Sequence, residues 1–272
     1  MDLVTAITDI LTHSFLLRAL IVGTLVSLCA ALLGVSLVLK NYSMIGDGLS
    51  HVGFGALAVA SVLGLAPLYV AVPVVIAAAF LLLRLNTKNV MGDSAIAMIS
   101  SGALAVGVLS VSLAGTNTDL ESYMFGSIMA INDADAALSI VLSVILITLF
   151  VVFYNRIFAV TFDESFARAT GTKASLINTV IAILTAITIV LGMRMMGALL
   201  ISSLIIFPCL TAMRIFKTFK SVCICAGVLS VICFLTGLTI SYMLGTPTGA
   251  SIVGVNIIAF AIFTAIGCIR RR

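Results

Sequence analysis

The stretch Met44-Ile45-Gly46-Asp47-Gly48-Leu49-Ser50-His51-Val52-Gly53-Phe54-Gly55 places a carboxylate and an imidazole at the start of an apolar run, which has no further charged residue until Arg84. Asp47 and His51 are four residues apart, so on a helix their side chains lie one above the other on one face. Together they can bind one divalent cation from two sides. The small residues around the pair leave room for another backbone or for an ion.

A second interpretation of the pair is structural. Asp47 and His51 could begin a helix at the membrane face, where the charge of Asp47 suits the positive end of the helix dipole. An aspartate at the middle of a membrane span costs at least ~2.5 kcal/mol, so such residues are rare without a function. The spacing alone leaves both interpretations open.

The composition of the 272 residues is typical of a polytopic membrane protein. Apolar residues make up 62% of the chain and charged residues only 9%, and the mean hydropathy is +1.33. A soluble domain would carry roughly a quarter charged residues, so this chain has too little polar surface to coat a water-soluble particle. We expect one transmembrane domain over 1–272, surrounded by lipid. The net charge of +4 is modest and does not indicate binding of nucleic acid.

Apolar segments of about 20 residues predict an all-α fold with about eight or nine transmembrane helices. The expected spans are 19–39, 47–65, 68–84, 94–114, 136–154, 174–193, 195–213 and two within 221–269, which turn at 244–249. The uncharged run 52–83 is too long for one crossing and is expected to break at 64–67. An apolar piece at 123–131 is too short to cross and is expected to be re-entrant or interfacial.

The positions of the basic residues support this alternation of spans. With the N-terminus outside, all of the 14 Lys and Arg residues except Arg18 and Arg194 fall on the inner side. Cytoplasmic loops carry an excess of Lys and Arg, so we expect the 156–173 loop and the C-terminus in the cytoplasm.

A short helix is predicted within that loop. Thr161 can cap its N-terminus, Asp163 and Glu164 fill its first turn, and Gly171 ends it. The helix could lie on lipid, with Phe166 as part of an apolar patch, or it could dock into a groove of a cytoplasmic partner.

Two sulfur-rich segments have weaker interpretations. Met193, Met195 and Met196 could bind soft copper(I), and Cys223 and Cys225 could form a soft-metal pair, but both sets are more typical of apolar filling. The six cysteines lie in or beside apolar runs and do not indicate a disulfide framework. No G-x-x-x-x-G-K motif occurs, so we do not expect this chain to be an ATPase.

Four segments resemble the membrane subunit of the zinc/manganese ABC importers, the metal-ion permease family. Residues 46–51 resemble the family segment G-D-A-L-S-H, with Gly48 where Ala is expected. Residues 162–171 resemble D-E-x-F-A-x-x-x-G, 197–212 resemble V-G-x-L-L-x-x-x-L-L-x-x-P-x-x-x-A, and 247–253 resemble P-x-G-x-x-I-V. The resemblances at 46–51 and 162–171 are the more specific of the four.

The resemblance implies a paired or homodimeric permease in the bacterial inner membrane. Its implied partners are cytoplasmic ATP-binding subunits and an extracytoplasmic metal-binding protein. It implies that Asp47 and His51 hold a transported Zn²⁺ or Mn²⁺ ion, with no permanently bound cofactor. It also implies about eight spans, one fewer than counted above, with the first 90 residues as the expected place of the difference. The residues implied to couple to the ATPase are Asp163, Glu164, Phe166, Ala167, Arg168 and Gly171.

Two other classes of function stay open at this point. A secondary transporter, driven by an ion gradient without an ATPase, often contains an inverted repeat, and we find no convincing internal repeat. An intramembrane enzyme would need a second reactive group facing His51, and we identify none in the sequence. Asp and His together suit Zn²⁺, Mn²⁺ and Fe²⁺, so the pair does not select the metal.

Overall fold

The computed structural model describes residues 14–87, 92–114 and 133–270, and their regular structure is entirely helical. The expected segment at 123–131 lies outside the described residues. The helices are α2 (Ser14–Leu39), α3 (Ser43–Val62), α4 (Pro67–Thr87), α5 (Gly92–Ala114), α7 (Asp133–Val152), α8 (Tyr154–Phe162), α9 (Glu164–Ala169), α10 (Ala174–Met196), α11 (Ala198–Met213), α12 (Phe219–Leu244) and α13 (Thr248–Arg270).

The long helices match the predicted spans. Seven of the described helices are long and apolar enough to cross a membrane, and α4 and α11 contain shorter apolar stretches, 67–83 and 198–213. The expected break at 64–67 is present between α3 and α4, where Gly64 has a positive φ of 66°. Residues 14–87 form three separate helices, α2, α3 and α4, so no merged segment appears within this range.

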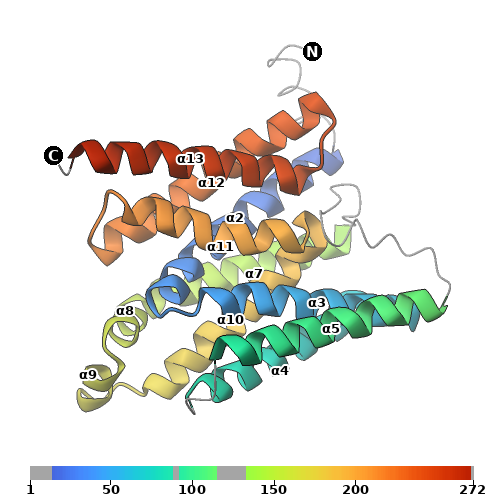
Figure 1. Ribbon diagram of the computed structural model, residues 1–272, viewed down its shortest axis with the longest axis horizontal. Coiled ribbons are helices and arrows are strands. Elements are labelled where there is room, and N and C mark those ends of the chain that lie inside the picture. The colour runs from blue at the N-terminus through green and yellow to red at the C-terminus, as the bar shows by residue number, and fades with distance from the viewer. Residues whose placement is uncertain (1–13, 88–91, 115–132, 271–272) are drawn as a thin grey trace.

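Successive long helices run back and forth, which sorts their connections to two ends of the bundle (Figure 1). The α2–α3 corner, helices α8 and α9, the α11–α12 connection and the end of α13 lie toward the left in Figure 1. The α3–α4 and α12–α13 connections lie toward the other end. The basic residues of the described connections gather at the first end, as the alternation of spans predicts: they are Lys40, Arg156, Arg168, Lys173, Arg214, Lys217 and Lys220.

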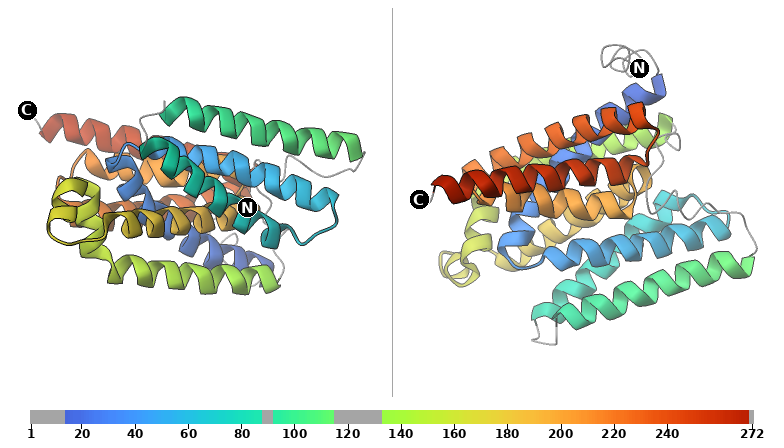
Figure 2. Two further views of the ribbon diagram at one scale, coloured as in Figure 1. Left: turned by 90° about the horizontal axis from the view of Figure 1, so that it is seen from below. Right: turned by 45° about the horizontal axis from the view of Figure 1, so that its top comes forward.

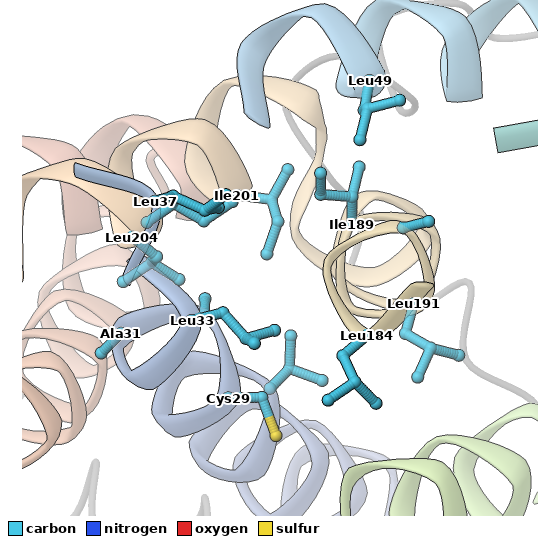
Figure 3. Packing of buried hydrophobic residues seen from close by; sticks show 14 of the residues in the cluster. Cys29, Ala31, Leu33, Leu37, Leu49, Leu184, Ile189, Leu191, Ile201 and Leu204 are labelled. Atoms are coloured by element: carbon cyan, nitrogen blue, oxygen red, sulfur yellow. The ribbon is translucent and has the colours of Figure 1, made fainter. Parts of the chain in front are cut away.

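The core lies between α2, α10 and α11, with α3 packed beside them. Leu33 of α2, Ile189 of α10 and Ile201 of α11 are fully buried and point into the same space (Figure 3). About two-thirds of the membrane-spanning part of α2 and of α10 is buried, against 11% for α13 and 17% for α5. Helices α13 and α5 therefore present most of their surface to lipid or to another chain.

Glycines allow α3 and α5 to approach closely. Gly55 of α3 and Gly107 of α5 lie back to back, and a Cβ added at Gly107 would be 2.8 Å from the Cα of Gly55. Small residues at such crossings are typical of helix packing in membranes. The contact holds α5 along one side of α3, the helix that carries Asp47 and His51 (Figure 2).

Candidate metal site and coupling helix

The start of α3 is set by a tight corner. Asn41 has a positive φ of 59°, a conformation that asparagine tolerates better than most residues, and the Tyr42 amide donates to the Leu37 carbonyl at 2.8 Å. Helix α3 then begins at Ser43, so its first turn contains no acidic residue. Asp47 and His51 lie in the second and third turns. The interpretation that the pair caps or begins a helix is therefore wrong.

Asp47 and His51 face each other on one side of α3, as their spacing predicts. Asp47 Oδ2 and His51 Nε2 are 3.7 Å apart, and the two side chains are 45% and 32% exposed. A Zn²⁺ ion placed ~2.1 Å from each atom would bind them at an angle of about 120°, close to tetrahedral. The pair is thus suited to share one cation without a change of backbone.

Neighbouring helices flank this side of α3 without covering it. Gly46, one residue before Asp47, faces Ile205 of α11, and Gly48, one residue after it, faces Ile96 of α5. In the single chain the pair therefore occupies a strip of α3 between α11 and α5, which lie on either side of α3 in Figure 1. Farther along the same side Phe54 is buried beneath α5.

A hydroxyl pair joins α3 to α11 beside the candidate site. Ser202 Oγ donates to Ser50 Oγ at 3.3 Å, and Ser50 Oγ donates to the Asp47 carbonyl at 2.7 Å. Sequence reasoning treated Ser50 only as a small residue and missed Ser202. The two serines are 152 positions apart, so no local pattern could have paired them.

The described part of the chain offers the cation no third strong ligand. No group of three or more His, Cys, Asp or Glu side chains that could hold a metal occurs among the described residues. Cys223 is buried, Cys225 is half-buried, and both are free thiols. Met193 is fully buried against Gly53, which agrees with its interpretation as apolar filling. A cation at Asp47 and His51 would need further ligands from water or another chain.

The short helix predicted in the 156–173 loop is present as α9, preceded by the separate helix α8. Asp163 is its N-cap: the residue is extended, and its Oδ1 accepts a hydrogen bond from the Phe166 amide at 2.9 Å. The prediction that Thr161 caps this helix is wrong, because Thr161 lies inside α8. Gly171, with φ of 84°, follows α9 as predicted, and the Thr172 amide closes the turn on the Ala167 carbonyl at 2.9 Å.

Helix α9 buries one of its sides against the bundle and exposes the opposite side to solvent. Ala167 is fully buried, whereas Phe166 is 64% exposed and Arg168 has a largely exposed side chain. The helix lies against α8 and α10 at the end of the bundle (Figure 1). An exposed aromatic ring beside a cation is a surface that another protein could cover.

Comparisons with known proteins agree on one family. Residues 12–267 match the ABC 3 transport family. The chain is 27% identical to the manganese transport system membrane protein MntC of Listeria monocytogenes, over 93% of this chain and 91% of that protein. It is 32% identical to the high-affinity zinc uptake system membrane protein ZnuB of Haemophilus influenzae, over 88% of this chain and 92% of that protein. A solved structure of PsaBC from Streptococcus pneumoniae in complex with Fab is similar with a TM-score of 0.87 and 27% identity, over 96% of this chain and 95% of that one.

Proposed function

This chain belongs to the ABC 3 transport family, and from that membership we propose that it is the membrane-spanning subunit of an ATP-driven importer that moves Zn²⁺ or Mn²⁺ into the cytoplasm. It is a permease subunit, and ATP is hydrolysed by a separate chain. Relatives named for manganese and for zinc transport support both metals as cargo. The family match favours an ATP-driven transporter over one that is driven by an ion gradient.

The transported metal is proposed to pass Asp47 and His51. The single observation that carries this is their geometry: a carboxylate and an imidazole 3.7 Å apart, on a strip of α3 that the described residues leave uncovered. Two protein ligands bind a cation less tightly than a closed structural site with four. A transport site must capture its ion without trapping it, so an incomplete ligand set suits the task.

A second copy of the permease is the proposed cover of this strip. A symmetric pair of chains would bring two Asp47–His51 pairs to one passage and could supply four ligands. The high exposure of α5 and α13 leaves ample apolar surface for such a contact. The metal reaches the passage from an extracytoplasmic binding protein, which contributes to the choice of metal.

The α9 end of the bundle is proposed to face the cytoplasm, together with the C-terminus. The basic residues gathered at that end support this orientation. The exposed Phe166 and Arg168 of α9 then meet the ATP-binding subunit, while Asp163 and Gly171 hold the ends of the helix in shape. Closure of the ATPase pair on ATP would move α9 and open the metal passage in turn to each side of the membrane.

Substitution of Asp47 and His51 tests the metal role. In cells that depend on this importer, Asp47→Ala and His51→Ala should each lower uptake of radiolabelled Zn²⁺ and Mn²⁺ at least about tenfold, while the amount of complex in the membrane stays unchanged. Asp133→Ala is the matched control, because it removes an exposed carboxylate far along the chain that pairs with Arg18. Normal growth of the Asp47→Ala/His51→Ala variant in metal-starved medium would show that the role assigned to the pair is wrong.

A further inference from the structure

A buried lysine connects the corner before α3 to helix α9. The side chain of Lys40, at the α2–α3 corner, is only 8% exposed, and its ammonium lies 3.8 Å from Glu164 Oε2. Lys40 Nζ also donates a hydrogen bond to Asn178 Oδ1, and Asn178 Nδ2 donates to Glu164 Oε2 at 3.0 Å. The α2–α3 corner therefore meets α9 and α10, which follow more than 100 residues later in the sequence, at one polar cluster.

The cluster is charged and partly shielded from water. Burial lowers the pKa of Lys40, and the nearby charge of Glu164 opposes this effect. Burial also disfavours the charge on Glu164, but hydrogen bonds from Asn178 and Arg168 and the charge of Lys40 outweigh it and lower its pKa. A small cavity of about 20 Å³, bordered by apolar side chains of α3, α4 and α10, lies beside Lys40 and Asn178. Apolar surroundings strengthen the attraction between the two charges.

The corner between α2 and α3 is short and hydrogen-bonded. Only Asn41 and Tyr42 separate Lys40 from the first residue of α3, and the Lys40 amide donates to the Ser36 carbonyl at 3.2 Å. At 1.5 Å rise per residue, Asp47 lies about 6 Å along α3 from Ser43 and His51 about 12 Å. A shift of Lys40 therefore acts directly on the turns that hold the candidate metal ligands.

We propose that Lys40, Glu164 and Asn178 form the link through which movement of α9 reaches α3 and the Asp47–His51 pair. The proposal rests on the proposed function, in which the ATP-binding subunit moves α9. If α9 moved without the corner, Lys40 would remain as a buried cation that has lost its counterion, which is unfavourable. The corner therefore follows α9. In this role the three residues position the metal site and do not bind the metal.

The alternative is that the cluster only fastens α9 to the bundle. The double variant Lys40→Met/Glu164→Gln separates the two roles, because it leaves no buried charge without a partner and is compatible with stable folding. Arg168, which also pairs with Glu164, keeps a largely exposed side chain in water. The permease is reconstituted in liposomes together with its ATP-binding subunit. Metal uptake and ATP hydrolysis are then measured in the same vesicles, and the readout is the number of metal ions imported per ATP.

We expect the double variant to assemble and to hydrolyse ATP, with import per ATP at least about tenfold lower than in the wild type. The single variant Lys40→Arg, which keeps the positive charge beside an intact Glu164, should retain most of the wild-type import per ATP. Arg18→Met is the matched control: it removes an ion pair of 2.6 Å between α2 and α7 that does not involve α9, and it should import normally. Equilibrium binding of Zn²⁺ to the double variant should be unchanged, since Asp47 and His51 are intact.

Import per ATP within twofold of the wild type in the double variant would overturn the proposal. Loss of the assembled complex in that variant would also overturn it, since the cluster would then serve folding. Either result leaves the proposed function standing as long as Asp47→Ala still abolishes uptake. Uptake that survives Asp47→Ala and His51→Ala would instead contradict the proposed function itself.

Discussion

Alanine at Gly107 should separate two helices that need to touch. A Cβ at this position would lie 2.8 Å from the Cα of Gly55 and 3.3 Å from the Cβ of Ala58, whereas ordinary contacts begin at about 3.4 Å. The nearest obstacle is backbone, so no side chain can rotate away from the new methyl group. Helices α3 and α5 must therefore move apart by roughly half an ångström or lose part of their packing, and overpacking of this kind costs ~1–3 kcal/mol.

Gly102→Ala provides the control for this substitution. It changes the same residue type in the same helix, and an added Cβ there would meet nothing within 4 Å. Both substitutions gain the same intrinsic helix propensity of up to ~1 kcal/mol, so the difference between the two variants isolates the steric cost. With about 2–4 °C in Tm for each kcal/mol in a chain of this size, Gly107→Ala should unfold at least ~2 °C below Gly102→Ala.

The buried thiols make this measurement possible without introduced cysteines. Cys29, Cys209, Cys223 and Cys233 are buried and free, so a thiol-reactive fluorogenic dye reports unfolding in detergent as they become exposed, above the constant signal of the exposed Cys268. Metal uptake by Gly107→Ala should also fall, because α5 borders the strip that holds Asp47 and His51. Equal unfolding temperatures for Gly107→Ala and Gly102→Ala would refute the steric argument, since the two positions differ only in what lies against them.

Two further predictions concern α9. Phe166→Ser removes an exposed ring, so the permease should fold normally but retain at least about tenfold less ATP-binding subunit in a pull-down; unchanged retention would contradict the docking role. Because the pKa of Glu164 is lowered, its contribution to anchoring α9 is complete above the ordinary glutamate pKa and is lost as the pH falls from there through the lowered pKa. The protection factors of the α9 amides, which correct for the slower intrinsic exchange in acid, should therefore fall on acidification in the wild type, and Glu164→Gln should lack this acid-dependent fall.

Much of the membrane architecture could be predicted from local patterns. The apolar runs predicted nine crossings, and the described residues contain seven long apolar helices and two with shorter apolar stretches at nearly the same places. This works because every backbone polar group in lipid must be satisfied within its own segment, so helices are the simple solution for each run. The same locality explains why Gly171 is correctly predicted as the end of α9 and why the error at Thr161 is small. Thr161 and Asp163 are both capping residue types and lie two positions apart, and only the backbone shows that Asp163 is the cap.

Contacts between distant segments could not be read from the sequence. Ser50 with Ser202, Gly55 with Gly107, and Lys40 with Glu164 are each separated by dozens of residues or more, and each depends on how helices cross. Lys40 in particular was counted only as a positive charge at a membrane face. Its burial against Asn178 became visible only when α10 was placed beside the α2–α3 corner.

Local sequence patterns are enough to predict a helical membrane protein, the positions of its helices, and the shared helix face of Asp47 and His51. These follow from hydropathy and from the helical period, which act over a few turns. The tertiary structure decided that the pair lies in an uncovered strip between α11 and α5, and that a buried ion pair joins α9 to the corner before α3. The exposure of a side chain and its contacts with distant residues depend on which helices become neighbours. The packing of the whole bundle determines those neighbours.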